Sequence, residues 1–492
     1  MLLKQLIKQL DCTILNGNDE INITDIIYDS RKVAKDTLFV CLTGTVFDGH
    51  DYAEDAVKKG AVALVVEKDV ELPQEYLTKV TVIKVKDTRY ALAIISAEYF
   101  NNPAKELITI GITGTKGKTT TTYMVKNILE SCGYKTGLIG TIETIIGDRK
   151  IPSCNTTPES YIVQKTFREM ADAGIKAVVM EVSSQGLMMH RCAGFVYDIG
   201  VFTNLEPDHI GPGEHATFEE YMHCKGLLFK QCKIGIVNID DKHTKSVIEG
   251  HTCKIETYGL SEGADTKALD IELINTPGSL GTKYQVKGLT NMEVNLKMPG
   301  MFSVYNSLCA IAISRHFDGI TSDKLKDALL NVNVKGRIEV VPISDRFTLM
   351  IDYAHNAMAL ESILKTLKEY NPTRLVCLFG CGGNRSKLRR YEMGEVSGKL
   401  ADLTIITSDN PRFEKPKDII DDIIVGIEKT DGKYVSIEDR KEAIKYSITN
   451  AKDGDIIILA GKGHEDYQEI EGKKYPMDER VIISDILKEI GW

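Results

Sequence analysis

The chain has 492 residues, of which 43% are hydrophobic and 27% charged, proportions typical of globular proteins. This length exceeds what one hydrophobic core usually supports, so two to four domains are expected. The 61 lysines and arginines against 70 aspartates and glutamates give a formal net charge of −9, which argues against nucleic acid or an anionic membrane surface as the partner.

The N-terminus and the cysteines predict a cytoplasmic protein. Residues 1–10 place lysines four apart within an apolar pattern, which favours an amphipathic helix over a signal peptide. No later apolar run is long enough to predict a membrane span. The 11 cysteines are odd in number and include no Cys-x-x-Cys pair, so neither a disulfide framework nor a zinc ribbon is indicated.

Three successive series of strands and helices follow along the chain. Residues 36–66 read as strand, loop, helix and strand, in a small α/β unit that ends near residue 103. A longer alternation has strands at 108–112, 177–180, 199–202 and 234–237, with a polar insertion at 262–294 that we expect to be antiparallel. A third series has strands at 348–351, 374–379, 403–407 and 456–459. This alternation predicts an α/β protein with doubly wound parallel sheets and three domains, at 1–103, 104–335 and 336–492.

The strongest local signal is a glycine loop between a predicted strand and a predicted helix at 121–132. Its sequence is Gly114-Thr115-Lys116-Gly117-Lys118-Thr119-Thr120. Loop amides and a helix N-terminus bind phosphate, Lys118 reaches the terminal phosphates and Thr119 can ligate magnesium. The strict P-loop pattern is missed, because Ile112 stands where the first glycine belongs. The alternative is a helix-capping turn with an incidental lysine.

A carboxylate follows the next apolar strand. Glu181 closes the run Ala177-Val-Val-Met-Glu181, and ligands of open α/β sheets gather at the carboxyl ends of strands. Glu181 is therefore the candidate magnesium ligand beside Thr119. The alternative is an ordinary exposed acid.

Several ordered motifs together resemble those of the Mur ligases. They are the loop at 114–120, Glu181-Val-Ser-Ser-Gln-Gly186, Thr203-Asn204, Asp208-His209, Asp352-Tyr-Ala-His355 and Asp409-Asn-Pro-Arg412, and the resemblance runs nearly end to end. These enzymes form amide bonds with ATP in the synthesis of peptidoglycan precursors. The resemblance implies a small N-terminal α/β domain that binds UDP, a central P-loop ATPase-like domain and a C-terminal Rossmann-like domain that binds an amino acid.

The resemblance also implies roles for individual residues. ATP would be held by residues 114–120 with Asn306, Arg337, Asp352 and His355, and magnesium by Thr119, Glu181, His209 and Lys225. The UDP-sugar substrate would contact Ser30, Asn155, Thr156, Thr157, Ser183 and Arg191. The catalytic set would be Lys118, Lys225 and His209.

Lys225 is singled out only by the resemblance. Residues 221–229 read as a helix with one polar lysine, which by itself indicates a solvated surface side chain. In the family, carbon dioxide carbamylates a lysine at this place, and the resulting anion ligates magnesium.

Three predicted strands of the last domain end in polar loops, which should converge on one crevice. The resemblance assigns them to meso-diaminopimelate, with Arg385 and Arg412 on its far carboxylate and Glu465 on its far ammonium, beside Asp409, Asn410, Pro411 and Gly461. Within the family, a segment like 409–412 marks diaminopimelate rather than lysine as the acceptor, so the resemblance implies diaminopimelate here. The expected reaction adds it to UDP-N-acetylmuramoyl-L-alanyl-D-glutamate through an acyl phosphate, in a protein expected to be a monomer.

The sequence departs from the family pattern at Met189, at 211–215 and at 356–358. These changes leave alternatives open: the same chemistry with L-lysine or another acceptor, or a nucleotide-binding paralogue without catalysis. A folylpolyglutamate synthetase would share the central loop, but the segment 409–412 and the N-terminal domain argue against it and against a lysine-adding ligase.

Overall fold

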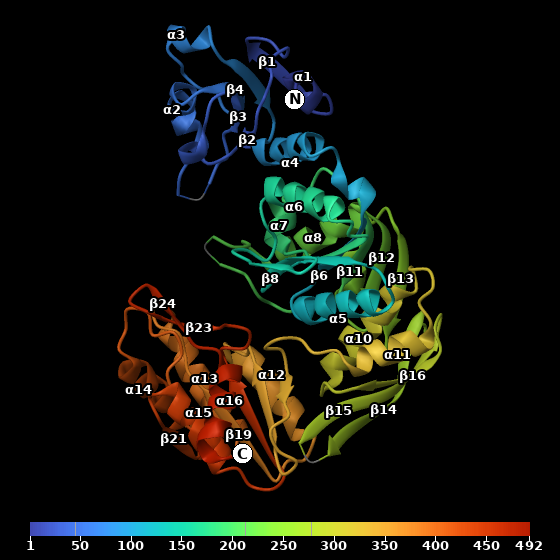
Figure 1. Cartoon of the computed structure of the whole chain (residues 1–492), viewed down its shortest axis with the longest axis vertical. Coiled ribbons are helices and arrows are strands. Elements are labelled where there is room, and N and C mark those ends of the chain that lie inside the picture. The colour runs from blue at the N-terminus through green and yellow to red at the C-terminus, as the bar shows by residue number, and fades with distance from the viewer. Residues whose placement is uncertain (45, 212, 277) are drawn as a thin grey trace. The chain divides into compact units, whose positions relative to one another are not determined.

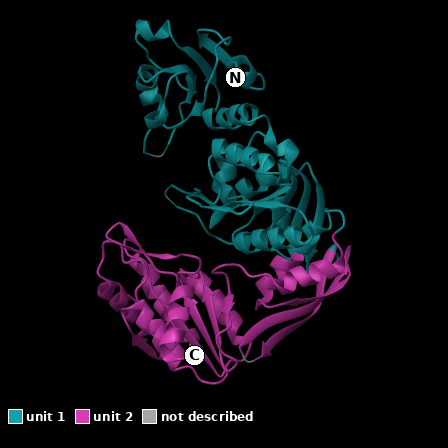
Figure 2. Ribbon diagram, in the orientation of Figure 1, with its two compact units in different colours: residues 1–265, 309–319 teal, residues 266–308, 320–492 magenta. Residues whose placement is uncertain are grey.

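The computed structural model describes residues 1–44, 46–211, 213–276 and 278–492. Pro212, in one of the departures from the family pattern, and Pro277, in the predicted insertion, lie outside the described residues. The chain divides into two compact units, residues 1–265 with 309–319 and residues 266–308 with 320–492 (Figure 2). The domain boundaries predicted at 103/104 and 335/336 stay a prediction.

The N-terminal sheet has the order β1-β5-β4-β3-β2, in which β1 is antiparallel to β5 and the other neighbours are parallel (Figure 1). Alternate residues of its buried strands face opposite sides, so both sides need a cover. Helices α1 and α4 pack on one side and α2 on the other. The elements are α1 (Leu3–Ile7), β1 (Cys12–Asn16), β2 (Ile26–Ile27), η1 (Ser30–Lys32), β3 (Thr37–Val40), η2 (Gly49–Tyr52), α2 (Ala53–Lys58), β4 (Ala61–Val66), α3 (Gln74–Leu77), β5 (Thr81–Val85), α4 (Thr88–Tyr99) and η3 (Pro103–Glu106).

The central sheet of the first unit runs β13-β12-β11-β6-β10-β7-β8-β9. Strands β13 to β7 are parallel, and β8 and β9 extend the edge as an antiparallel ribbon. Its elements are β6 (Ile108–Thr113), α5 (Lys118–Ser131), β7 (Thr136–Ile139), β8 (Glu143–Ile146), β9 (Arg149–Pro152), α6 (Ser160–Asp172), β10 (Ala177–Glu181), α7 (Ser184–Met188), β11 (Tyr197–Phe202), α8 (Phe218–Gly226), η4 (Leu227–Lys230), β12 (Cys232–Asn238), α9 (Thr244–Val247) and β13 (Lys254–Gly259).

The predicted insertion is antiparallel, as expected. Strands β14 (Thr266–Thr276), β15 (Ser279–Gly288) and β16 (Met292–Leu296) pair in a meander within the second unit. Helices α10 (Met301–Ser314) and α11 (Ser322–Leu330) follow in sequence.

The third sheet has the order β17-β18-β22-β19-β20-β21, parallel except for the edge strand β17. A separate hairpin, β23 with β24, follows β22. The elements are β17 (Glu339–Val341), β18 (Thr348–Asp352), α12 (Ala357–Lys368), β19 (Arg374–Phe379), α13 (Lys387–Leu400), β20 (Leu403–Ile406), α14 (Pro416–Ile427), β21 (Tyr434–Ser436), α15 (Arg440–Thr449), β22 (Asp455–Ala460), β23 (Tyr467–Ile470), β24 (Lys473–Pro476) and α16 (Glu479–Ile490).

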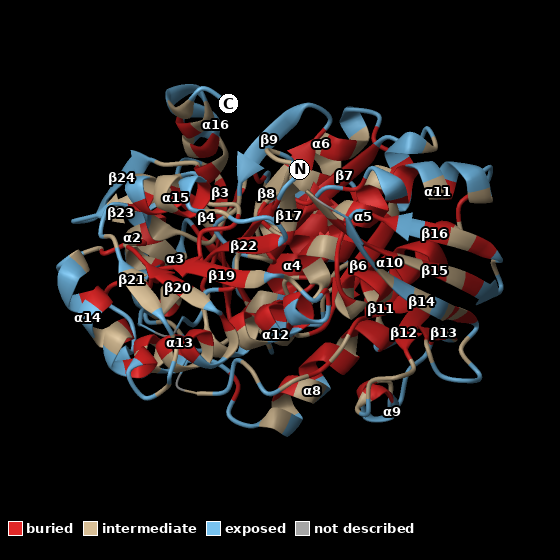
Figure 3. Ribbon diagram, turned by 90° about the horizontal axis from the view of Figure 1, so that it is seen from below, coloured by how far each residue is buried: buried red, intermediate tan, exposed pale blue. Residues whose placement is uncertain are grey.

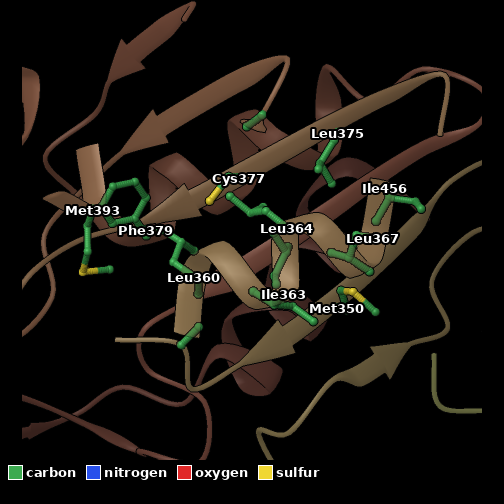
Figure 4. Packing of buried hydrophobic residues seen from close by; sticks show 14 of the residues in the cluster. Met350, Leu360, Ile363, Leu364, Leu367, Leu375, Cys377, Phe379, Met393 and Ile456 are labelled. Carbon is green, nitrogen blue, oxygen red and sulfur yellow. The ribbon is translucent and has the colours of Figure 1, made fainter. Parts of the chain in front are cut away.

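Alternating strand residues cover this sheet on both sides, as the predicted doubly wound arrangement requires. Leu375, Cys377 and Phe379 of β19 face α12, α13 and α14 (Figure 4), whereas Val376 and Leu378 face α15 and α16. The four inner strands, β18, β22, β19 and β20, are consequently buried along nearly their whole length (Figure 3). The predicted class, a three-domain α/β fold, is confirmed, while the N-terminal helix is shorter than the amphipathic pattern over residues 1–10 suggested.

Candidate active site

The glycine loop joins β6 to α5 at the carboxyl edge of the central sheet. Ile112, which occupies the position of the missing glycine, is fully buried in β6, so the turn begins later, at Gly114. Gly114 has a φ of +148°, and a Cβ there would lie 1.9 Å from Oγ1 of Thr203. No residue with a side chain fits this position without displacing Thr203.

The segment after β11 supports the loop from behind. The Thr203 hydroxyl donates to the carbonyl of Lys116 at 2.7 Å, and the amide of Lys116 donates to Oδ1 of Asn204 at 2.9 Å. The amide of Thr115 donates to the carbonyl of Asn204 at 2.9 Å. These bonds preorganise the loop so that α5, which begins at Lys118, presents its N-terminus to a ligand.

Two lysines converge on the carbonyl of Gly114. Nζ of Lys118 lies 2.8 Å from that oxygen, and Nζ of Lys225, from α8, lies 2.9 Å from it. Lys225 is only 2% exposed, which overturns its interpretation as a solvated surface lysine. Burial, and then the nearby charge of Lys118, lower the pKa of Lys225 well below its ordinary value.

The two predicted magnesium ligands nearest the loop are in contact. Oγ1 of Thr119 donates to Oε2 of Glu181 at 2.9 Å. Thr141 donates to the same carboxylate through its amide, at 2.8 Å to Oε1, and through its hydroxyl, at 3.0 Å to Oε2. Glu181 is 1% exposed, so it is not the exposed acid of the alternative interpretation.

A cavity of about 180 Å³ connects the loop to the predicted sugar-side residues. Among its lining residues, Lys118, Asn155, Thr156, Thr157, Ser183, Arg191, His209 and Lys225 were all predicted from the sequence. A larger cavity of about 440 Å³ lies in the N-terminal domain, but its lining includes none of the predicted site residues. The smaller cavity, and not the larger one, is therefore lined by predicted site residues.

The carboxylate of Glu159 connects Arg191, one of the predicted sugar-side residues, to the N-terminal domain. Nε of Arg191 donates to Glu159 at 3.0 Å, and Arg89, from α4, lies 3.4 Å from the same carboxylate. A guanidinium nitrogen of Arg191 also lies 3.6 Å from the sulfur of Met189, so this departure from the family pattern is a direct neighbour of a predicted substrate contact. Ser30, in η1, is partly exposed and its carbonyl accepts from Lys59.

Thr156, Thr157 and Ser183 hold the strand ends in place around the wall. The hydroxyl of Thr156 lies 3.0 Å from that of Thr141, and the Thr157 hydroxyl donates to the carbonyl of Glu181 at 2.9 Å. Oγ of Ser183 accepts from the amide of Gly186 at 3.0 Å and caps α7.

His209 and His215 differ sharply in burial. His209 has a φ of +54°, is exposed, and its Nδ1 lies 3.1 Å from Oε1 of Glu214. His215 is buried, its Nε2 lies 2.8 Å from Oγ of Ser184, and its Nδ1 has no hydrogen bond among the described residues but lies 4.0 Å from Oε2 of Glu220. Burial lowers the pKa of His215. The sequence marked this segment only as a departure from the family pattern and missed His215, Ser184 and Tyr221 as cavity residues.

The predicted nucleotide residues of the second unit lie on or beside β18, except Asn306, which is buried on α10. The guanidinium of Arg337 lies over the ring of Tyr353, 4.7 Å from its centroid. Asp352 accepts from the amides of Ile338 and Ala354, each at 2.9 Å. Nδ1 of His355 lies 3.0 Å from the carbonyl of Tyr353.

A close backbone approach joins this region to the loop after β22. Gly336 has a φ of +66°, and a Cβ on it would lie 2.1 Å from both the carbonyl carbon of Gly463 and the amide nitrogen of His464. A side chain at position 336 would therefore force the two segments apart.

The departure at 356–358 has a structural role. Asn356 precedes α12, and its Oδ1 accepts from the amide of Ala359 at 2.8 Å. Asn356 is thus the N-cap of the helix that covers one side of the third sheet.

The predicted acceptor residues gather where β19, β20 and β22 end. Arg412 has a φ of +52°, donates through Nε to Glu469 at 3.0 Å, and donates to the carbonyl of Gly383 at 2.7 Å. Arg385, on the neighbouring loop, is exposed. Pro411 is buried between these segments, and its carbonyl closely approaches Gly383.

Asn410 and Glu465 are already joined through a lysine that sequence reasoning passed over. Nδ2 of Asn410 donates to Oε2 of Glu465 at 2.9 Å, and Nζ of Lys462 donates to the same oxygen at 2.8 Å. Asp409 is buried with Oδ1 at 3.7 Å from Nζ of Lys462, and a Cβ on Gly461 would meet Oδ2 of Asp409 at 3.0 Å. Lys462 carried no signal except its place in the Gly461-Lys-Gly-His-Glu465 loop.

Arg390 connects the loop that carries Arg385 with the loop that carries Arg412. It is buried, donates to Glu414 at 2.8 Å and to Asp422 at 2.9 Å. Glu414 also accepts from the amide of Asn384. Because Asn384 precedes Arg385 and Glu414 follows Arg412 by two residues, this ion pair fixes the loops relative to each other.

Family models match along most of the chain. They are described as the Mur ligase family catalytic domain at residues 22–100, the Mur ligase middle domain at 112–314, and the Mur ligase glutamate ligase domain at 336–463. The chain belongs to the Mur ligase family. The resemblance inferred from the ordered motifs is thereby confirmed.

Mur ligases with named activities are similar over the full length. A UDP-N-acetylmuramoyl-L-alanyl-D-glutamate–2,6-diaminopimelate ligase of Caldanaerobacter subterraneus subsp. tengcongensis is 47% identical, over 96% of this chain and 97% of that protein. A ligase of the same name from Clostridium acetobutylicum, numbered 1, is 45% identical over 100% of both. A solved structure of a ligase with this name has a TM-score of 0.74 and 28% identity, and the match covers 100% of this chain and 99% of that one.

Proposed function

We propose that this Mur ligase joins meso-diaminopimelate to UDP-N-acetylmuramoyl-L-alanyl-D-glutamate at the expense of ATP. One observation carries the proposal: a single cavity brings Lys118 of the phosphate loop together with Asn155, Thr157 and Arg191 of the predicted substrate wall. A phosphate donor and a carboxylate acceptor bound in that cavity would lie next to each other. The similar proteins named for this activity support the choice of substrates.

The residues at the loop fit a magnesium ion. A hydroxyl and a buried carboxylate, Thr119 and Glu181, lie in contact beside the phosphate loop, and Mg²⁺ prefers such oxygen ligands. His209 lies on the same cavity and is the proposed ligand of a second ion. Bound magnesium would neutralise charge on the transferring phosphoryl group.

We propose that Lys225 is carbamylated by carbon dioxide. Only the neutral amine reacts with carbon dioxide, and burial next to Lys118 favours that form. The reaction forms a bond from Nζ to the carbon of carbon dioxide and releases a proton, which leaves an anion. That anion would relieve the repulsion between the two lysines and add a metal ligand beside Glu181.

The reaction needs no side-chain nucleophile. The γ-phosphate of ATP passes to a free carboxylate of the D-glutamyl residue, the acceptor amine attacks the resulting acyl phosphate, and phosphate leaves as the amide forms. The loop amides and Lys118 hold the phosphoryl oxygens during both steps. Arg191 and its neighbours Thr156, Thr157 and Ser183 orient the peptide carboxylate.

In the second unit, we propose that Arg337, Asp352, His355 and Asn306 contact the nucleotide. Arg385 and Arg412 would bind the far carboxylate of the acceptor and Glu465 its far ammonium, since a guanidinium binds a carboxylate in a bidentate fashion. The substrates are small molecules, and we propose that the protein acts as a cytoplasmic monomer. Within the described residues, no helix is long and apolar enough to cross a membrane.

The deciding experiment measures phosphate release and product mass with ATP, magnesium and UDP-N-acetylmuramoyl-L-alanyl-D-glutamate. Meso-diaminopimelate, L-lysine and L-ornithine are compared as acceptors. Turnover only with diaminopimelate is expected. Turnover with another acceptor would retain the ligase and reject the roles of Arg385, Arg412 and Glu465, and absence of turnover with all three would favour a non-catalytic paralogue.

A further inference from the structure

Lys462 is completely buried in the loop after β22, with 0% of its surface exposed. Its Nζ donates to Oδ1 of Asn410 at 2.9 Å, to Oε2 of Glu465 at 2.8 Å and to the carbonyl of Tyr467 at 2.5 Å. An ammonium group has three N–H bonds, so all its donors are used. The lysine joins the loop after β20, the loop after β22 and the hairpin strand β23.

These bonds fix the orientation of Asn410. Because an ammonium group only donates, the amide oxygen of Asn410 must face Lys462, and it also accepts from the amide of Glu469 at 2.9 Å. The amide nitrogen of Asn410 is then directed to Glu465. Lys462 and the amide of Glu469 thereby determine together which end of the Asn410 side chain meets the carboxylate.

The same bonds leave one carboxylate oxygen of Glu465 able to accept a hydrogen bond from a ligand. Oε2 accepts from both Asn410 and Lys462, whereas Oε1 has no hydrogen bond to any described residue. The carboxylate is thus held at a fixed angle with one oxygen free. That oxygen can accept one further donor, and an ammonium group is the strongest such partner.

We propose that Lys462 is a positioning residue for the acceptor, which orients Glu465 and Asn410 so that the acceptor's far ammonium is selected. This inference rests on the proposed function, because it assumes that Glu465 meets that ammonium. Lys462 itself does not contact the acceptor. Its effect should therefore be confined to acceptors that carry a second ammonium.

The test compares two acceptors in wild type and in Lys462→Met. Meso-diaminopimelate has the far ammonium and the far carboxylate, whereas 2-aminopimelate has the far carboxylate alone. For Lys462→Met we expect kcat/KM for diaminopimelate to fall about tenfold or more, chiefly through KM, and that for 2-aminopimelate to fall less than about threefold, since one charge-assisted contact is lost. The KM values for ATP and for the UDP-linked substrate should stay unchanged.

Lys474→Met is the matched control. Lys474 lies over the ring of Tyr467, 3.9 Å from its centroid, as Lys462 lies over it at 5.2 Å, but it is exposed and contacts neither Asn410 nor Glu465. This variant should keep the wild-type preference between the two acceptors. Thermal unfolding of each variant measures the structural cost separately.

A double-mutant cycle keeps the proposal testable if Lys462→Met folds poorly. The double variant Glu465→Gln/Lys462→Met removes one cation and one carboxylate together, so these two charges remain balanced. It should show the same reduced preference for diaminopimelate as the single variant Glu465→Gln. Additive losses, or equal losses for both acceptors, would overturn the role of Lys462. Absence of turnover by the wild-type protein would instead reject the proposed function.

Discussion

Two buried lysines distinguish the two halves of the machinery. Lys225, beside the phosphate loop, is 2% exposed and meets the carbonyl of Gly114, the ring of Tyr221 and the charge of Lys118. Lys462, in the acceptor region, is 0% exposed and meets the carboxylate of Glu465 and two neutral oxygens. One lysine is buried beside a cation and the other beside an anion.

The difference shows which of the two lysines is prepared for chemistry. A buried charge without a counter-ion is costly, so Lys225 favours its neutral and nucleophilic form. A buried charge with a full set of acceptors is stable and orders its neighbours, as Lys462 does. The lysine of the phosphate region is thus prepared to react, whereas the lysine of the acceptor region holds its neighbours in a fixed arrangement.

The largest loss of turnover is expected from a substitution in the phosphate region, at Lys118. Lys118→Ala removes a cation that we propose holds the transferring phosphoryl group, and kcat should fall by about 100-fold or more. Phosphate release under saturating substrates measures this loss, and the affinity for the UDP-linked substrate should change little. Unchanged turnover would remove Lys118 from the chemical step.

The second prediction concerns the neutral form of Lys225. Lys225→Gln cannot form a carbamate, and turnover should fall by about 50-fold, because a metal ligand is lost. Wild-type enzyme stripped of carbon dioxide should lose activity and regain it with bicarbonate, whereas the variant should not respond. A wild-type rate independent of bicarbonate, in a protein whose mass shows no carbamate, would contradict this role.

A smaller effect is expected at the acceptor end. Arg412→Lys keeps the charge but loses the planar fork, so KM for diaminopimelate should rise about tenfold with kcat less affected. Steady-state kinetics with each substrate varied in turn measures the split. Equal changes in KM for ATP and for the acceptor would place Arg412 outside the acceptor site.

The smallest effect concerns His464, a partly buried group with several cations nearby. Burial, followed by Arg337, Lys335 and Arg480, lowers the pKa of His464 to about 4. The unfolded chain binds a proton near pH 6.5 and the folded protein only near pH 4, so stability falls as the pH is lowered through that window. His464→Phe should remove about 1 kcal/mol of this loss, a value reduced because the ring is partly exposed.

Thermal unfolding of wild type and His464→Phe at pH 7 and pH 4.5 measures this difference. The variant should lose less stability than the wild type on acidification. Parallel losses in the two proteins would show that His464 does not titrate in this range.

The sequence predicted the elements well because their apolar runs are continuous. The strands at 108–112 and 374–379 are buried on both sides of a parallel sheet, which leaves an unmistakable composition. The motifs also predicted part of the cavity lining, including Lys118, Arg191 and Lys225, but not His215, Ser184 or Tyr221. What the sequence could not show is burial within a helix: a single lysine among mostly apolar neighbours is typical of a solvated side chain, and only the packing of α8 beneath the phosphate loop removes Lys225 from water.

The same limit applies to Lys462 and His215. Each owes its role to partners distant in sequence, Asn410 in one case and Ser184 in the other, and no local pattern encodes those contacts. Glu465 was predicted as an acceptor ligand, but its existing bonds to Lys462 and Asn410 were not foreseeable.

The close approach of Gly336 to Gly463 has a mechanical consequence. The two backbones touch without a side chain between them, so the segment that carries Arg337 and the loop that carries Lys462 and Glu465 cannot slide past one another independently. A displacement of residues 336–337 would therefore move the acceptor loop as well, because no side chain lies between the two backbones to absorb it by rotating. The proposed nucleotide-side and acceptor-side groups of this domain would therefore move together.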